Sequence, residues 1–184
     1  TGAGMLFSGI GASTGASQST VFPTPYDWSS SSNGERKGLV IDFPGATEVM
    51  DETTDLATKF LGIGGAGAFC LVFINPFVMA SPDCKVVKNA KEQFGANHIL
   101  IVCTNCDAKD ANGEYQVEKF GGAEGIQNYV VGMLRADPYD TYIDVSSVLV
   151  GSFVKDADNL HDGVMNPTQL QTAVHNYIWP TVGS

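Results

Sequence analysis

Positive charge is scarce in this chain of 184 residues, which has 10 lysines and arginines against 20 aspartates and glutamates. The net charge of −10 predicts repulsion from nucleic acids and from anionic membrane surfaces. The sequence also has no run of about 18 apolar residues, which a membrane-spanning helix needs. We therefore expect no nucleic-acid partner and no membrane span.

Histidine and cysteine are also rare, with three and four residues. Cys103 and Cys106 form a CxxC pair that is compatible with a redox pair, half of a zinc site or a set of disulfide partners. A zinc site lacks its second half, because Cys70 and Cys84 are widely spaced. We expect a structural role and no bound metal. The even cysteine count and the start at Thr1 without a leader favour a secreted or extracellular protein, or a domain excised from a larger one.

Apolar residues are abundant, at 43% of the chain, and predict one folded domain over residues 1–184. Short apolar runs alternate with stretches that suit helices, a pattern typical of a parallel sheet with crossover helices. We predict an α/β fold, a three-layer α/β/α sandwich with a five-stranded, mainly parallel sheet of the flavodoxin-like kind. The five predicted strands are Met5 to Phe7, Leu39 to Ile41, Phe69 to Ile74, His98 to Cys103 and Thr141 to Val145.

Helix signals are local and distinct. Ser81-Pro82 predicts a helix start, and an apolar stripe from Ile126 to Leu134 predicts a second helix that ends before Asp137-Pro138. Asn166-Pro167 predicts the start of the last helix. A further stripe through Val49, Leu56 and Phe60 predicts a helix between the second and third strands.

The first predicted strand runs into a segment rich in glycine and serine, Gly9 to Gly15. Its glycines allow a sharp turn that leaves Ser13 at the carboxyl edge of the sheet, where open α/β sheets bind ligands. No lysine follows these glycines, which excludes a P-loop. A dinucleotide-binding loop competes, but Thr14 stands where its third glycine belongs. Ser13 is thus either a nucleophile or a residue of an ordinary loop.

A second group of reactive residues precedes the last helix. Asp158 and His161 lie three residues apart, so the carboxylate can orient the imidazole for proton transfer. Gly45 and Asn75 follow the second and third predicted strands and are candidate donors to an oxyanion. The alternative interpretation makes His161 a solvated loop residue, Gly45 a turn residue and Asn75 a strand terminator.

These four segments resemble, in order, the blocks of the SGNH, or GDSL-type, esterases and lipases. Gly11-Ala12-Ser13 is similar to the nucleophile block, Pro44-Gly45-Ala46-Thr47 to the glycine block, Asn75 to the asparagine block and Asp158-Asn159-Leu160-His161 to the closing block. The resemblance implies an SGNH-hydrolase fold with Ser13 as nucleophile, His161 as general base and Asp158 as its orienting residue. It also implies an oxyanion hole from Ser13, Gly45 and Asn75.

From this resemblance we expect a serine esterase, a carboxylic ester hydrolase that cleaves small acyl esters, acetyl esters on carbohydrate above all, through an acyl-enzyme. Its substrate would be a small-molecule or glycan ester, and it would need no cofactor. Two departures favour an alternative, an impaired domain that binds glycan or protein. Ala12 replaces the acid beside the serine, and Asp162 to Met165 can also be aligned with the closing block, which would put Met165 in place of the histidine.

Overall fold

The computed structural model describes residues 2–7, 24–30, 36–42, 68–154 and 160–180. The chain divides into two compact units, Thr1–Leu61 and Gly62–Ser184. The expected helix around Leu56 lies outside the described residues.

The described part of the first unit contains one short helix and one pair of strands. Helix α1 spans Gly2–Leu6, and strands β1 (Thr24–Ser30) and β2 (Arg36–Asp42) pair antiparallel. Phe7 follows α1, and its ring meets the Trp28 ring of β1 edge to face, with centroids 5.4 Å apart. Edge-to-face contact is a favourable arrangement for two aromatic rings.

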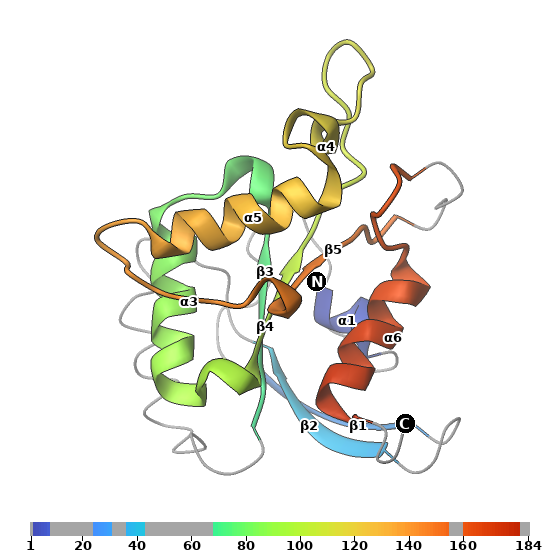
Figure 1. Cartoon of the computed structure of the whole chain (residues 1–184). Helices are drawn as coiled ribbons and strands as arrows, with labels where there is room; N and C mark the ends of the chain where they lie inside the picture. The colour runs from blue at the N-terminus through green and yellow to red at the C-terminus, as the bar shows by residue number, and fades with distance from the viewer. Residues whose placement is uncertain (1, 8–23, 31–35, 43–67, 155–159, 181–184) are drawn as a thin grey trace. The chain divides into compact units, whose positions relative to one another are not determined.

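The second unit is built on a parallel sheet in the order β3-β4-β5. These strands span Cys70–Ile74, Ile99–Cys103 and Val148–Val150. Helices α3 (Ser81–Phe94) and α5 (Gly122–Arg135) lie on one side of the sheet, and α6 (Pro167–Ile178) lies on the other (Figure 1). Shorter elements connect them: η2 (Pro76–Val78), η3 (Ala96–His98), α4 (Gln116–Lys119) and η4 (Val145–Ser147).

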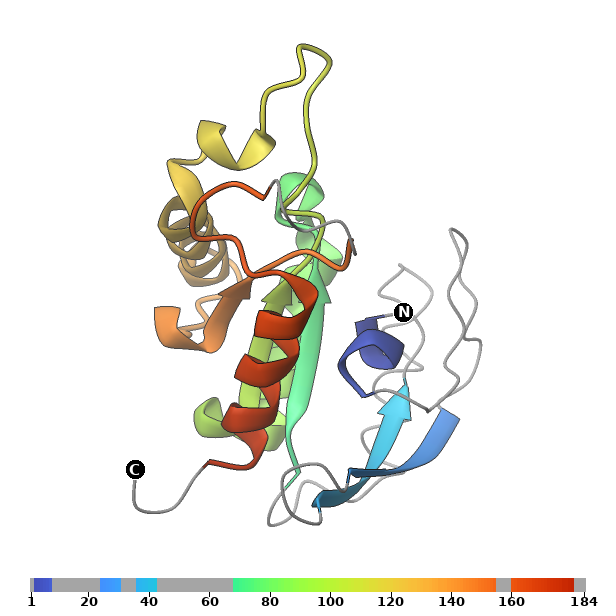
Figure 2. The ribbon, with the colours of Figure 1, turned by 90° about the vertical axis from the view of Figure 1, so that its right-hand side faces the viewer.

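The core of this unit lies between the sheet and α3 and α5. All five residues of β4 are buried, as expected for a central parallel strand that is covered on both faces. Alternate strand residues meet the buried side chains of the two helices, among them Val87, Ile126, Val130 and Leu134. On the opposite face α6 runs along the sheet (Figure 2), and the Tyr177 hydroxyl of α6 contacts the carbonyl oxygen of Ile99 at 2.8 Å.

The local helix signals are confirmed by the structure. Helix α3 begins at Ser81, with Ala80 rather than Ser81 as the N-cap residue. Helix α5 ends before Asp137-Pro138. At the start of α6, Asn166 and Gln169 form a capping box, in which each side chain bonds the other's backbone N–H.

The predicted five-stranded, mainly parallel sheet is wrong, because the described strands form a two-stranded antiparallel sheet and a three-stranded parallel one. Leu39 to Ile41 do lie in a strand, β2, but only five residues connect β2 to the end of β1. Such a short connection joins antiparallel strands, whereas a parallel crossover needs a dozen residues or more.

Two further strand predictions are wrong. Met5 and Leu6 lie in α1. The segment from Thr141 to Val145 is not a strand, although Thr141 and Ile143 are buried and Tyr142 between them is exposed. In an extended segment that packs one side against a core, burial alternates from residue to residue even when the segment forms no hydrogen bonds to a neighbouring strand. The strand in this region, β5, begins at Val148.

Candidate functional site at the carboxyl edge of the sheet

The loops after β4 and β5 stay hydrogen bonded beyond the ends of the strands. The Gly151 N–H donates to the Cys103 carbonyl at 3.1 Å, and the Cys106 N–H donates to the Gly151 carbonyl at 3.3 Å. The residues that flank Gly151 bond to Met165. The Met165 N–H donates to the Val150 carbonyl, and the Ser152 N–H donates to the Met165 carbonyl. These bonds hold three loop segments together at the carboxyl edge, where open α/β sheets bind ligands.

Asp107 and Ser152 meet within these loops. The Ser152 hydroxyl donates to Oδ1 of Asp107 at 2.8 Å and accepts the Val154 N–H at 3.1 Å. Ser152 is fully buried and Asp107 is half-buried. Because the single hydroxyl proton is committed to Asp107, the carboxylate is held in one orientation at the end of the central strand.

A tight turn brings Asp107 to this position. Asn105 has a φ of 59°, in the left-handed region that asparagine tolerates better than most residues. The Ala108 N–H then donates to the Asn105 carbonyl at 3.0 Å and closes the turn. The chain reverses over four residues, which places the Asp107 side chain beside the start of the β5 loop.

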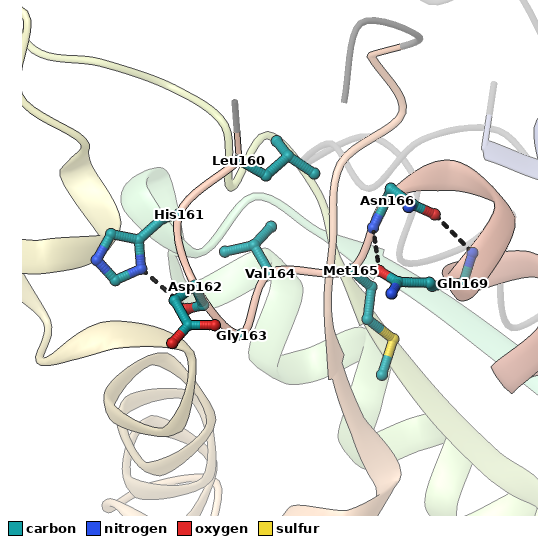
Figure 3. A pocket seen from close by; sticks show the side chains of 8 residues that line it. All are labelled: Leu160, His161, Asp162, Gly163, Val164, Met165, Asn166 and Gln169. Carbon is teal, nitrogen blue, oxygen red and sulfur yellow. Dashed lines mark hydrogen bonds between the residues drawn. The ribbon is translucent and has the colours of Figure 1, made fainter. Parts of the chain in front are cut away.

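A hollow of about 580 Å³ lies next to this edge, within the segment that precedes α6 (Figure 3). The capping box occupies the side-chain oxygens of Asn166 and Gln169, and the lining residues with ionisable side chains are His161 and Asp162. The lining residues are Leu160, His161, Asp162, Gly163, Val164, Met165, Asn166 and Gln169.

Among the residues predicted for an esterase site, His161 and Asn75 are described. His161 contacts the Asp162 carbonyl and the Glu118 carboxylate. The Asn75 side chain accepts the Phe77 N–H at 3.1 Å and caps η2. Ser13, Gly45 and Asp158 lie outside the described residues, so the triad and the oxyanion hole stay predictions.

All four cysteines are free thiols. Burial raises the pKa of Cys106 to about 12 and also raises the pKa of Cys103, which keeps both thiols protonated and unreactive near neutral pH. This agrees with a structural role for the CxxC pair. In the described ranges, no three ionisable side chains gather as metal ligands. None of the helices described there combines the length and hydrophobicity that a bilayer crossing requires.

The sequence matches no protein-family model and no curated protein. The solved structures that resemble the chain include two described in terms of chloroplast Toc proteins. One is a dimerization-deficient mutant of Toc33 from Arabidopsis thaliana, with a TM-score of 0.62, 15% identity and coverage of 95% of this chain and 77% of that one. The other has a TM-score of 0.63, 17% identity and coverage of 94% of this chain and 74% of that one. Its description states that dimerization is important for the GTPase activity of the chloroplast translocon components atToc33 and psToc159. The chain thus has an α/β fold similar to that of these two structures.

This fold overturns the resemblance to SGNH esterases and the expectations built on it. The predicted serine esterase, its ester or glycan substrate and the alternative of an impaired glycan- or protein-binding SGNH domain are all wrong. The second neighbour is described in terms of GTPase activity, which is a hydrolytic activity but not the cleavage of carboxylic esters. The physical reason for the error is that each matched block is only one to four residues long. Glycine turns and polar strand ends of that length occur in many α/β proteins.

Neither Asp107 nor Ser152 was predicted from the sequence to be a site residue. Asp107 follows a correctly predicted strand by four residues, so a search for acids after each strand would have found it. A search of the same kind would not have found Ser152, because the last strand was predicted several residues too early in the sequence.

Proposed function

We propose that this chain binds a guanine nucleotide at the carboxyl edge of the β3-β4-β5 sheet, with Asp107 recognising the base. The observation that carries the proposal is the hydrogen bond of 2.8 Å from the buried Ser152 hydroxyl to the Asp107 carboxylate. The likeness to a structure described in terms of GTPase activity supports it.

The chemistry of a carboxylate favours guanine over adenine. Guanine presents two neighbouring donors, N1–H and the N2 amino group, whereas adenine presents an acceptor, N1, beside its N6 amino group. An ionised carboxylate accepts hydrogen bonds only, so it pairs with both guanine donors and repels N1 of adenine. Ser152 uses one acceptor position of Asp107 and leaves the rest of the carboxylate for the base.

The fixed orientation of Asp107 also favours binding. Ser152 is anchored by its own N–H to the Met165 carbonyl at 3.0 Å and by the Val154 N–H to its hydroxyl oxygen. A carboxylate that is already oriented loses little conformational freedom when the base arrives.

The phosphate end of the nucleotide would be held differently from that of P-loop proteins. The segment Gly9 to Ser17, which lies outside the described residues, contains glycines and hydroxyl residues but no lysine. A P-loop lysine reaches the β- and γ-phosphates. We therefore expect contacts to the base to dominate affinity, similar binding of GDP and GTP, and slow hydrolysis of GTP.

A titration with fluorescently labelled GDP tests the proposal. Asp107→Asn replaces an acceptor with a donor against guanine, so we expect a loss of about 1–3 kcal/mol, or about 5- to 150-fold in affinity. Xanthosine diphosphate should gain affinity for this variant, because xanthine has a carbonyl where guanine has its N2 amino group.

Asp140→Asn is the matched control, because it makes the same chemical change at an exposed residue in another loop. Equal binding of ADP and GDP by the natural chain, or unchanged GDP affinity in Asp107→Asn, would refute base recognition by Asp107.

A further inference from the structure

The loop that joins β4 to α4 contains a tight turn at residues 110–113. The loop projects away from the sheet (Figure 1), and its tip holds Asn112 and Gly113, which are both exposed. Gly113 has a φ of 81°, in the left-handed region that favours glycine, and a Cβ there would meet nothing within 4 Å. Among the asparagines in the described ranges, Asn112 alone precedes a glycine. The backbone nitrogen that follows Asn112 therefore has no side chain beside it that would shield it from the asparagine amide.

The side chain of Asn112 is free to rotate. Its backbone N–H donates to Oδ1 of Asp110 at 2.8 Å, but its side-chain amide has no hydrogen-bond partner in the part of the chain that the structure describes. Exposed side chains without partners change rotamer on the fastest timescales of protein motion. The side-chain carbon Cγ of Asn112 can thus approach the Gly113 nitrogen.

Asp110 holds the backbone of this turn in place. Its carbonyl oxygen accepts the Gly113 N–H at 3.0 Å, and its Oδ1 accepts the N–H groups of Asn112 at 2.8 Å and Glu114 at 3.0 Å. Oδ2 pairs with Lys119 at 2.7 Å. The Lys119 side chain first, and the Glu114 N–H second, lower the pKa of the Asp110 carboxyl, so it accepts these bonds as a carboxylate near neutral pH. The turn also engages the Gly113 N–H in a hydrogen bond.

We propose that Asn112 is a site of spontaneous deamidation and that the turn built on Asp110 slows the reaction. This inference concerns a covalent modification and does not depend on nucleotide binding. Asparagine is one of the thermolabile residues. The Gly113 nitrogen loses its proton and bonds to Cγ of Asn112, the Cγ–Nδ2 bond breaks, and the amide nitrogen takes up a proton and leaves as ammonia. Water then opens the succinimide at one of its two carbonyl groups, which leaves aspartate or isoaspartate at position 112.

Either product changes the loop. Both add a negative charge close to Asp110 and Glu114, and like charges at short distance repel each other. Isoaspartate also places an additional methylene group in the backbone, which disturbs the antiparallel bridge between Lys109 and Tyr115 that closes the loop. Deamidation therefore loosens the segment that connects β4 to α4.

Peptide mass spectrometry of the whole chain tests the site. The chain is kept for days at physiological temperature in a mildly alkaline buffer and cut with trypsin, which releases the peptide from Asp110 to Lys119 with Asn112 as its single asparagine. We expect this peptide to acquire the mass of an acid in place of an amide, with fragment ions that locate the change at Asn112. Asn97 and Asn105 are also exposed but precede larger residues, so they should stay unchanged. Conversion of Asn112 no faster than that of Asn97 and Asn105 would overturn the proposal.

Two variants test the role of Asp110. Asp110→Ala removes the carboxylate that braces the turn, so we expect Asn112 to convert about 2- to 10-fold faster, the effect of losing hydrogen bonds of ordinary strength. Lys119→Gln is the matched control, because it removes the exposed ion pair, leaves the acceptor in place and should convert at the natural rate. An unchanged rate in Asp110→Ala, or an equal acceleration in Lys119→Gln, would refute protection by the turn. Asn112→Gln should show no conversion, because a glutamine would have to close a larger ring.

Discussion

At the scale of single residues, Ser152 determines how Asp107 is presented. Its hydroxyl is fully buried and makes two hydrogen bonds, one given to the Asp107 carboxylate and one accepted from the Val154 N–H. Hydrogen bonds to charged groups contribute more to stability than neutral ones, and a buried partner left without its bond is costly. Ser152 therefore links the stability of this edge to the orientation of the carboxylate.

We predict that Ser152→Ala lowers the free energy of unfolding by about 1–3 kcal/mol, because the hydrogen bond to Asp107 is lost and the Val154 N–H loses its acceptor. GDP affinity should fall as well, because Asp107 is then free to rotate. Urea denaturation and the labelled-GDP titration measure the two effects. Reduced stability with unchanged GDP affinity would restrict Ser152 to a structural role.

Residue-scale prediction from sequence succeeded only in part, for a physical reason. His161 was selected as chemically important, and it does make specific contacts, but one of them, Glu118, is 43 positions away and cannot be inferred from spacing. The partnership of Asp107 with Ser152 spans 45 positions. Such pairs depend on how strands are ordered in the sheet, which single residues do not encode.

At the scale of elements, helices were predicted better than strands. The starts of α3 and α6 and the end of α5 depend on caps and prolines within a few residues, such as Asn166 with Gln169. Strand identity depends on a distant partner. The three-residue run from Met5 to Phe7 is too short for its periodicity to separate a strand from a helix, and it enters α1.

The packing of α6 on β5 depends on the absence of a side chain at Gly151. A Cβ there would lie 2.9 Å and 3.0 Å from the two methyl carbons of Leu170, which is itself fully buried. We predict that Gly151→Ala lowers the free energy of unfolding by about 1–3 kcal/mol, the usual cost of an overpacked core. Thermal or urea unfolding checks this value.

Gly132→Ala is the matched control, because Gly132 lies within α5 with nothing within 4 Å of its missing Cβ. Alanine favours helix over glycine by about 1 kcal/mol, so this change should be stabilising. The double variant Gly151→Ala with Leu170→Val should recover part of the loss, since it removes the clashing atoms. No recovery would show that the clash with Leu170 is not the cause.

At the scale of the whole molecule, the two units differ in how much structure and buried core each contains for its own stability. The described part of the first unit offers one antiparallel strand pair and a five-residue helix, and an isolated strand pair is marginally stable in water. The second unit has a parallel sheet with helices on both faces. Its hydrophobic core cluster contains buried residues from Val72 to Val164, all inside Gly62–Ser184.

We therefore predict that a fragment of residues 62–184 folds on its own, because the cluster that stabilises it lies wholly within it. Circular dichroism should show its helices, and urea unfolding should give one cooperative transition. A fragment of residues 1–61 should lack a cooperative transition under the same conditions. If residues 62–184 were unfolded alone, the parallel sheet would depend on the first unit, and nucleotide binding would then have to be tested in the complete chain only. If they fold and bind GDP, Asp107 and the loops that hold it are sufficient for recognition of the base.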